Sequence, residues 1–474
     1  MNLSPRSVPV RVVENAGRIV FFAAIGILTS SGGELPPLSV VASVVALAAV
    51  AVTAWQVAYV RRFSYAVTED TFDIASGVLS RREREIPYER VQNVDISQNV
   101  LQRALGLAAV RIETAGGTGT EATLRYVTRA EASRLQELLG ERKRGDRGAD
   151  ETEPEAETLF TLSERELGVL GVVSADPRVV GLLSVAVSVF APRLATQLQP
   201  GVDLLSLAGP AVALVVLVGL WILSAVTAVF RYYGFELRRQ GEELRYERGL
   251  LQRYSGTIPL EKVQTLRLRE NALARALGYA GLVIETAGYG PGQDGGAQSA
   301  VPLAKRDRAL ALAREVEPVG DIAFERPPKR ARTRYLVRYA LVVLAATGAL
   351  WAVDAVTGWV SVWYLAAGLL LAVPPAAHLA WRNRGYHAGE NYFVTRNGFW
   401  RRETVIVPYD RVQTVASSRT VFQQRRDLGT LRVDTASTGG FFGTAAAAVD
   451  VDGALAEHLR EDVHDRFQRS MGAD

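Results

Sequence analysis

The side chains that could do chemistry are few and do not form a catalytic pattern. The chain has no cysteine, which excludes thiolate chemistry and cysteine-ligated zinc. Its histidines lack metal-ligand spacing, and no serine joins one of them in a nucleophilic triad. These histidines are His378, His387, His458 and His464. The sequence therefore predicts no metal, no cofactor and no enzymatic activity.

Glycine-rich segments and paired carboxylates also have non-catalytic interpretations. Gly116–Gly119 and Gly288–Gly296 lack the lysine and the following helix of a phosphate-binding loop, so we interpret them as hairpins or flexible loops. Glu83 and Glu85 alternate with arginines on a predicted strand, which is typical of solvated charges that pair across strands.

Three arginines are the best candidates for a shared role because they recur at one position of an internal repeat. The three copies of the repeat align without a gap and cover Gly77–Thr114, Gly249–Thr286 and Gly398–Thr435. The arginine follows the first glycine by four residues and is Arg81, Arg253 or Arg402. Two interpretations are open. These arginines contact anionic lipid headgroups or an acidic partner segment, or they form a salt bridge that fixes the rim of a small barrel.

The elements that must position these arginines follow from the repeat. Its first glycine closes a turn that needs a positive φ, and a strand then runs to a proline, which is Pro87, Pro259 or Pro408. Val91, Val94 and Ile96 have strand-like spacing, and Asn99–Leu105 reads as one or two helical turns. A left-handed cap follows at Gly106, Gly278 and Asp427. The strand Val110–Thr114 closes the unit.

Each repeat extends into a larger module. Short strands at Phe63–Val67 and Phe72–Ile74 precede the first repeat, and Ala122–Val127 follows it. The second repeat has equivalent strands at Phe235–Leu237 and Leu244–Tyr246. An amphipathic helix then closes each module, and we place it at Arg129–Arg142, Leu303–Val316 and Leu455–Phe467. A module of about seven short strands and a closing helix suits a small barrel or orthogonal sandwich.

A pair of apolar segments precedes each repeat. The pairs are Ile19–Leu28 with Leu38–Val60, Val179–Phe190 with Leu207–Phe230, and Tyr335–Val353 with Trp359–Trp381. A bilayer takes about 20 residues, so three transmembrane hairpins are predicted, although the first members of the first two pairs are short. Ser163–Val173 reads as an interfacial helix with Glu166 in a capping box.

Basic residues predict the orientation of these hairpins. Arginines such as Arg61, Arg62, Arg231, Arg382 and Arg384 flank the ends that lead to or from the repeats, whereas the loops inside the hairpins hold one basic residue, Arg193. All three repeats and the N-terminus are therefore expected on the cytoplasmic side. Arg330, Arg332 and Arg334 lie in a basic flank that either holds anionic headgroups or is an ordinary positive-inside flank.

This combination resembles a known family. The pattern G-h-h-x-R, then [IV]-P-x-x-x-V-Q, R-x-L-G and a strand that ends in Glu-Thr-Ala is similar to bacterial and archaeal pleckstrin-homology (PH) domains of the second type. Paired helices before each of three such domains resemble the YdbT-type membrane-flanked family. The third copy departs at Asp427, which replaces a glycine, and at Gln424, which replaces Arg103 and Arg275. The resemblance implies a link to envelope stress and resistance to antimicrobial compounds.

The predicted fold class is an α+β membrane protein with three transmembrane hairpins, each followed by a PH-like β-barrel or sandwich with a C-terminal capping helix. The predicted segments are 1–60 (N-terminus and hairpin 1), 61–142 (PH-like domain 1), 143–160 (charged linker), 161–230 (interfacial helix and hairpin 2), 231–318 (PH-like domain 2), 319–334 (basic linker), 335–381 (hairpin 3) and 382–474 (PH-like domain 3).

Three functions remain in competition. The first is a non-catalytic scaffold in the cell membrane that binds proteins or itself. The second is a module that senses anionic lipid headgroups. The third is an accessory component of a transporter or export system, which the scarcity of ionisable residues in the apolar segments weakens; Arg338 and His378 are the exceptions. A net charge of +4 is too small to indicate nucleic acid.

Overall fold

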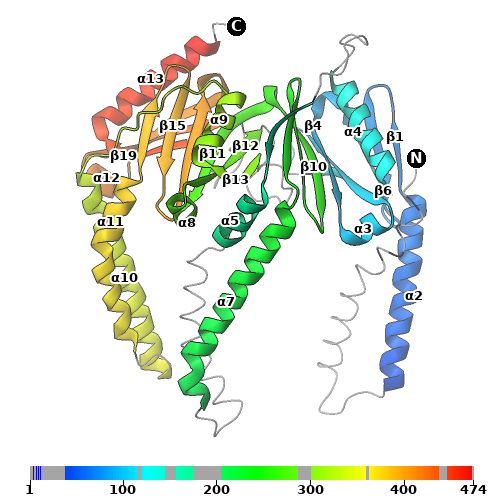
Figure 1. Cartoon of the computed structure of the whole chain (residues 1–474), viewed down its shortest axis with the longest axis horizontal. Helices are drawn as coiled ribbons and strands as arrows, with labels where there is room; N and C mark the ends of the chain where they lie inside the picture. The colour runs from blue at the N-terminus through cyan, green and yellow to red at the C-terminus, as the bar shows by residue number, and fades with distance from the viewer. Residues whose placement is uncertain are drawn as a thin grey trace. The chain divides into compact units, whose positions relative to one another are not determined.

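The computed structural model describes residues 4, 7, 9 and 11, and then 38–114, 120–144, 156–174, 204–286, 300–358, 362–436 and 446–471. The chain divides into two compact units (Figure 1). Unit 1 comprises Met1–Glu157 with Arg238–Ile258, and unit 2 comprises Thr158–Leu237 with Pro259–Asp474.

The strands and helices fall into three modules with one order of elements. Module 1 consists of β1 (Ser64–Val67), β2 (Thr71–Ser76), β3 (Arg82–Pro87), β4 (Val91–Gln98), α3 (Val100–Ala104), β5 (Leu107–Thr114), β6 (Thr120–Thr128) and α4 (Arg129–Arg144). Module 2 consists of β8 (Glu236–Gln240), β9 (Glu243–Arg248), β10 (Arg253–Pro259), β11 (Val263–Asn271), α8 (Ala272–Ala276), β12 (Tyr279–Thr286), β13 (Val301–Lys305) and α9 (Arg306–Val316). Module 3 consists of β14 (Gly385–Ala388), β15 (Tyr392–Asn397), β16 (Arg401–Pro408), β17 (Val412–Ser418), α12 (Val421–Gln424), β18 (Leu428–Thr435), β19 (Ala446–Asp452) and α13 (Gly453–Met471).

The sheets combine strands of different modules. One sheet consists of β1-β2-β3, and another has the order β6-β5-β4-β10-β9-β8-β7, in which β7 is Glu157–Thr161. In unit 2, the order is β13-β12-β11-β16-β15-β14, and β17-β18-β19 form a separate sheet. Module 1 therefore shares a sheet with the first strands of module 2, and the last strands of module 2 share a sheet with the first strands of module 3. The sequence predicted separate modules and did not predict this sharing.

Modules 1 and 3 each have a core that a terminal helix covers. In module 1, Phe72, Ile86 and Ile96 of the strands pack with Leu135 of α4, and all four are at most 2% exposed. In module 3, Phe393 and Leu431 pack with Val463 of α13 in the same way. The alternation of buried and exposed residues along these strands puts one face of each sheet on the core.

The glycine turns have the conformation that the sequence predicted. Gly77, Gly249 and Gly398 have φ values of 114°, 103° and 95°. A Cβ atom added at any of them would lie 1.9 Å from the carbonyl oxygen three residues later. The predicted left-handed caps are also confirmed, because φ is 67° at Gly106, 76° at Gly278 and 50° at Asp427. Only glycine fits the first position, whereas Asp427 shows that a side chain is accommodated at the second.

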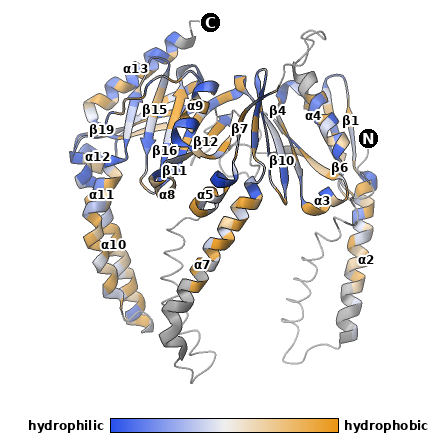
Figure 2. Ribbon diagram, in the orientation of Figure 1, coloured by the Kyte–Doolittle hydropathy of each residue, from blue (hydrophilic) through white to orange (hydrophobic). Residues whose placement is uncertain are grey.

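Long apolar helices precede the modules (Figure 2). They are α2 (Leu38–Arg62), α7 (Leu204–Tyr232), α10 (Arg330–Thr357), and the continuous pair η3 (Trp363–Ala372) and α11 (Val373–Arg382). Within the described residues, Arg330–Thr357 and Trp363–Arg382 are long and apolar enough to cross a membrane. Leu341 and Val342 of α10 are 56% and 61% exposed, which is costly in water unless lipid or protein covers them. Of the six apolar segments, Ile19–Leu28 and Val179–Phe190 lie outside the described residues.

Several details of the sequence prediction were wrong. In the described residues each module has six strands and not about seven, because the Pro-Tyr or Pro-Leu step forms a short 3₁₀ turn at Tyr88–Arg90, Leu260–Lys262 or Tyr409–Arg411. The helix expected at Leu303–Val316 begins at Arg306, since Leu303 belongs to β13. The segment expected at Trp359–Trp381 starts with a 3₁₀ stretch, Trp363–Ala372.

One strand and one helix at the start of unit 2 complete the fold. β7 (Glu157–Thr161) was not predicted; Leu162 N–H donates to Phe235 O beside it at 3.0 Å. The helix expected at Ser163–Val173 is present as α5 (Glu164–Ser174), and its capping box forms between Ser163 and Glu166. Its interfacial position stays a prediction.

The glycine turn gives a stability prediction. We expect Gly398→Ala to lower the apparent free energy of unfolding by about 2–4 kcal/mol, because the new Cβ meets the Arg401 carbonyl oxygen at 1.9 Å and φ is 95°. Thermal unfolding of the purified full chain in detergent measures this loss. Gly278→Asp is the control, because Asp427 occupies the equivalent position of module 3, and it should cost less than about 1 kcal/mol. Equal losses for both variants would contradict the argument.

Candidate functional site at the strand edges between modules

The edge between modules 2 and 3 is a long antiparallel ladder. β11 pairs with β16 from Leu266 opposite Ile406 to Asn271 opposite Arg401. Leu266 and Ile406 are fully buried at this edge. Arg267 is also buried, 2% exposed, and its guanidinium lies 2.6 Å from Glu285 and 3.8 Å from Glu403. Six consecutive pairs of this kind leave neither strand with an open edge.

The repeated arginine of module 3 lies in this ladder. Arg402 stands opposite Glu270 and makes two parallel hydrogen bonds to its carboxylate, at 2.8 and 2.9 Å. The Glu270 side chain is 2% exposed and that of Arg402 is 14% exposed. A buried, bidentate guanidinium–carboxylate pair has strict geometry, so it fixes which residues face each other across the edge.

The edge between modules 1 and 2 has the same register. β4 pairs with β10 through Gln98 opposite Arg253, Ser97 opposite Tyr254 and Ile96 opposite Ser255. Gln98 and Glu270 both lie 21 residues after the first glycine of their repeat, since 98−77 and 270−249 both give 21. Arg253 and Arg402 both lie four residues after theirs. The same two positions therefore stand opposite each other at both edges: at the second they form an ion pair, whereas at the first the Gln98 amide donates to the Leu107 carbonyl oxygen and Arg253 approaches Glu247.

A second contact recurs at both edges. Arg103 of α3 donates to the carbonyl oxygen of Leu250 at 2.8 Å, and Arg275 of α8 donates to that of Phe399 at 2.9 Å. Both acceptors are the first residue after the turn glycine of the following module. The short helix after β4 or β11 thus holds the turn from which the next module's strand starts.

Positive charge gathers around Glu270. Burial lowers the pKa of Arg275, Arg402 lowers it further, and Glu270 opposes both effects. Burial also lowers the pKa of Arg396 to about 10, with further lowering from Arg402, Arg326 and Arg306. Arg306 itself lies 3.4 Å from the Glu270 carboxylate. One buried carboxylate therefore serves several guanidinium groups, so its loss would leave like charges together.

The other two repeated arginines lie in more open surroundings. Arg253 approaches Glu247 of its own module at 3.5 Å, and about half of each side chain is exposed. Arg81 lies 2.9 Å from Glu83, and both side chains are 69% exposed. Whether these arginines contact lipid, a partner or only the protein remains a prediction.

The basic flank lies against carboxylates of module 3. Arg330 is within 2.5 Å of Asp452 and 3.4 Å of Asp427. Arg334 makes two hydrogen bonds to Asp450, at 2.5 and 2.7 Å. Arg332 is exposed, and its guanidinium lies 6.0 Å from the centre of the Trp381 ring.

Asp450 connects the apolar helix α10 to a sheet. It is fully buried in β19 with φ of 61°, and it also accepts hydrogen bonds from Tyr335 of α10 and Gln423 of α12. Four donor contacts satisfy a carboxylate that would otherwise be costly to bury. The start of α10 is therefore fixed to module 3 by polar contacts.

The four histidines lie on α11, β14 and α13. His378 of α11 stacks at 5.8 Å from Trp381, and His387 of β14 lies 6.3 Å from Tyr392. His458 and His464 lie on α13, where His464 contacts Gln468 at 3.0 Å. Within the ranges that the structure describes, no three histidine, aspartate or glutamate side chains are placed to hold a metal ion.

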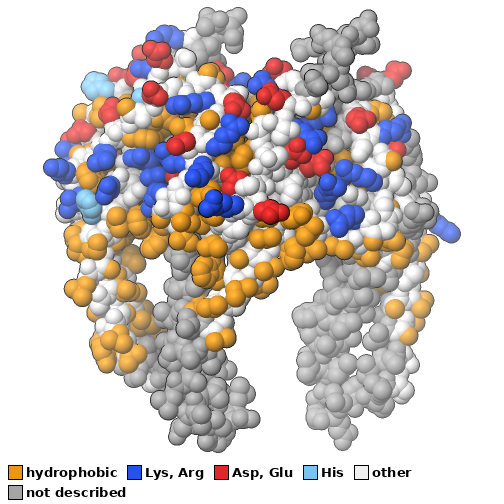
Figure 3. Space-filling model, viewed as in Figure 1, with side chains coloured by type: hydrophobic (Ala, Val, Ile, Leu, Met, Phe, Trp, Pro, Cys, Tyr) orange, Lys and Arg blue, Asp and Glu red, His pale blue; other side chains and the backbone are white. Residues whose placement is uncertain are grey.

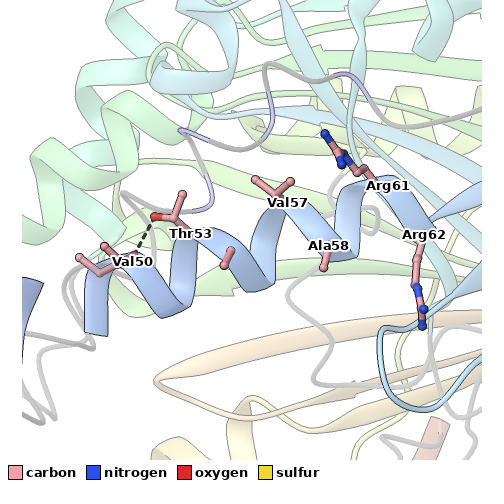
Figure 4. A pocket seen from close by; sticks show the side chains of 8 residues that line it. Val50, Thr53, Val57, Ala58, Arg61 and Arg62 are labelled. Carbon is pink, nitrogen blue, oxygen red and sulfur yellow. Dashed lines mark hydrogen bonds between the residues drawn. The ribbon is translucent and has the colours of Figure 1, made fainter. Parts of the chain in front are cut away.

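A hollow of about 730 Å³ lies beside α2 (Figure 4). Its described lining comes from one face of that helix, with Val50, Thr53 and Val57 along the helix and Arg61 and Arg62 at its end. The Thr53 hydroxyl already donates to the Ala49 carbonyl oxygen. This surface of small apolar residues is typical of helix–helix packing and has no group suited to acid–base chemistry.

Sequence reasoning identified one side of each edge but missed the other. It singled out Arg253 and Arg402, and it noted Arg103 and Arg275, but it did not pair them with Gln98, Glu270 or the turn carbonyls. The signal was present, because position 21 of the repeat is Gln or Glu in the two copies that have a following module and is Arg419 in the third.

Comparisons with known proteins agree with this architecture. The family model described as "Bacterial PH domain" matches residues 19–143, 180–319 and 339–467, and the chain therefore belongs to the bacterial PH domain family. The chain is also similar to the UPF0699 transmembrane protein YdbT of Bacillus subtilis (strain 168), with 27% identity over 404 residues that cover 80% of each protein. No solved structure matches the chain.

These comparisons show a YdbT-type membrane protein with three bacterial PH-like domains, as the repeat indicated. The fold is α+β with several antiparallel sheets, and the two helices of the described residues that are long and apolar enough to cross a membrane agree with a membrane location. PH-like domains and a relative of this kind suggest a non-enzymatic protein.

The buried ion pair gives a testable difference between the two edges. We expect Arg402→Ala to lower the apparent free energy of unfolding by about 2–3 kcal/mol, because it leaves Glu270 buried with only the more distant Arg306. Arg253→Ala, which removes an exposed pair, should cost less than about 1 kcal/mol. Chemical denaturation of the full chain in detergent provides both values.

A double-mutant cycle then tests whether the pair itself is responsible. Arg402→Gln combined with Glu270→Gln should show a coupling energy of more than about 1 kcal/mol. A coupling energy near zero would mean that the two side chains stabilise the edge independently.

Proposed function

We propose that this protein is a non-catalytic, multi-pass membrane scaffold whose three PH-like modules are joined edge to edge on the cytoplasmic side and bind partner proteins. The observation that carries the proposal is the repeated edge, in which β4·β10 and β11·β16 use one register and the same two repeat positions. Each edge joins strands of two modules by backbone pairing, and several modules on one chain raise the effective concentration of weakly binding partners.

The surface of unit 2 supports contact between module and bilayer. Figure 3 shows apolar side chains along α7, α10 and α11, whereas charged side chains gather over the sheets. Exposed apolar residues also occur at the C-cap of α8, on the turn before β16 and on α12, where Leu277, Trp400 and Phe422 are 48–59% exposed. α8 and α12 lie at the end of the sheets from which α7 and α10 extend (Figure 1). Such residues suit the membrane interface.

The positive-inside pattern supports three hairpins with cytoplasmic modules, since an even number of crossings returns the chain to the same side each time. Ile19–Leu28 and Val179–Phe190 would supply the first helices of hairpins 1 and 2. The process that this scaffold serves, envelope stress and antimicrobial resistance by the family resemblance, stays a prediction.

Anionic lipid is the second candidate ligand. The observation that favours it is the excess of guanidinium groups around Glu270, together with the exposed Arg332 beside Trp381. If lipid headgroups are the ligand, the full chain in anionic nanodiscs should unfold at a higher temperature than in neutral ones, and the difference should disappear in high salt. Equal unfolding temperatures would leave the scaffold as the only supported role.

The topology predicts the location of reporters. Fluorescent proteins that mature only in the cytoplasm should be bright when fused after Arg142, Val316 or Asp474, and reporters active only outside should stay silent at these points. Any fusion with the reverse result would contradict the cytoplasmic placement.

The joined edges can be tested in intact membranes because the chain has no cysteine of its own. Leu268 and Thr404 stand opposite each other in β11·β16, so the pair Leu268→Cys with Thr404→Cys should form a disulfide on mild oxidation. The control is Leu268→Cys with Val405→Cys, because Val405 is one residue out of register and points to the other face. Failure of the first pair to crosslink would contradict the scaffold.

A further inference from the structure

Of the three equivalent strands β3, β10 and β16, β3 is the one whose outer edge is open in the part of the chain that the structure describes. It is the last strand of the sheet β1-β2-β3, whereas its equivalents β10 and β16 lie inside larger sheets. The side chains of these strands differ in burial accordingly. The β3 side chains from Arg82 to Glu85 are all exposed, whereas Val405, Ile406 and Val407 of β16 are buried.

β3 keeps the arginine with which one of its equivalents, β16, binds the neighbouring module through Arg402 and Glu270. Arg81 occupies the repeat position of Arg253 and Arg402, which face Gln98 and Glu270. Its present contact, with Glu83, is a solvent-exposed ion pair. Such pairs contribute little to stability, so Arg81 can exchange Glu83 for a carboxylate or amide on an incoming strand at little cost.

The opposite end of the repeat series has lost the complementary residues. In module 3, Arg419 occupies the position of Gln98 and Glu270, and it donates to the Gly453 carbonyl oxygen within its own module. Gln424 replaces Arg103 and Arg275, which hold the turn of the following module. β17 therefore lacks the residues that contact a following module, whereas β3 retains the arginine that its equivalents carry.

We propose, on the basis of the scaffold function above, that β3 receives a β4-type strand from a PH-like module on a different polypeptide. That strand carries Glu or Gln opposite Arg81 and, five residues later, an arginine on a short helix. This second arginine donates to the Val78 carbonyl oxygen, the equivalent of the Leu250 and Phe399 acceptors. Arg62 already donates to Val78, but a carbonyl oxygen accepts two hydrogen bonds.

A second copy of this chain fits the edge poorly. In the shared register its β17 would place Arg419 opposite Arg81, a like-charge pair. Pairing β3 with β3 of another copy would match Arg82 with Glu85 and Glu83 with Arg84. However, two antiparallel strands of one sheet are related by a two-fold axis perpendicular to that sheet. This rotation reverses the direction of every element that runs parallel to the strands. α2 runs roughly along β1 (Figure 1), so the two copies would point their membrane helices in opposite directions.

The test uses a defined probe, a labelled synthetic peptide of residues 263–277, which is this chain's own β4-type strand with Glu270 and Arg275. The full chain in nanodiscs should bind it, and Arg81→Glu should weaken binding about tenfold or more. A peptide with Glu270→Arg should bind the wild-type chain weakly and the Arg81→Glu chain tightly. Arg134→Glu on α4, an exposed arginine of the same module, is the matched control and should change nothing. Absence of peptide binding, or binding that ignores these charge reversals, would overturn the proposal.

A photo-crosslinking amino acid at position 82 or 84 of the full chain in cells identifies the occupant. The expected product joins β3 to a peptide from a PH-like module of another protein, with the two required residues at the stated spacing. A crosslink to a second copy of this chain, to a protein without such a module, or to nothing at all would overturn the assignment. None of these results depends on β11·β16, so the cysteine pair in that edge can still support the scaffold if the β3 proposal fails.

Discussion

An open strand edge exposes unpaired backbone N–H and C=O groups, and this constraint organises the whole chain. Two of the three modules solve it by sharing a sheet with the module that follows. At the second edge a buried guanidinium–carboxylate pair, Arg402 with Glu270, sets the register, and a further arginine, Arg275, holds the adjoining turn. The ladder removes the open edge, and the charged pair allows only one alignment, because a slip by one residue would bury each charge without its partner.

The differences among the three repeats follow from their place in the series. Modules 1 and 2, which another module follows, share a glycine, a Gln or Glu, and an arginine at three repeat positions. Module 3 has Asp427, Arg419 and Gln424 at these positions. From the sequence alone these look like loss of pattern. In the structure, Arg419 and Asp427 contact groups of module 3 and of α10 instead. The residues that would face a fourth module have been turned to internal contacts.

Local features could be predicted from the sequence and pairings between modules could not. The turn glycines, the capping box at Ser163 and the closing helices depend on neighbours within a few residues, so a motif reveals them. Gln98 and Arg253 are 155 residues apart, since 253−98 gives 155, and neither is unusual in its own strand. The pairing becomes predictable only when position 21 of one repeat, which is Gln or Glu, is compared with the arginine at position 4 of the next repeat.

The apolar helices account for how such distant edges meet. Bringing together strands separated by well over a hundred residues has an entropic cost that grows with the length of the connection. In the proposed topology the apolar helices lie in one bilayer and confine the modules to a thin layer, which lowers the entropic cost of pairing the strands. Asp450 shows how closely the two are linked, because it binds Arg334 and Tyr335 of α10 from within β19. A module whose sheet is fixed to its own membrane helix presents its edge at one height and in one orientation. Another module anchored in the same way will therefore meet it in register, whether or not the two belong to one chain.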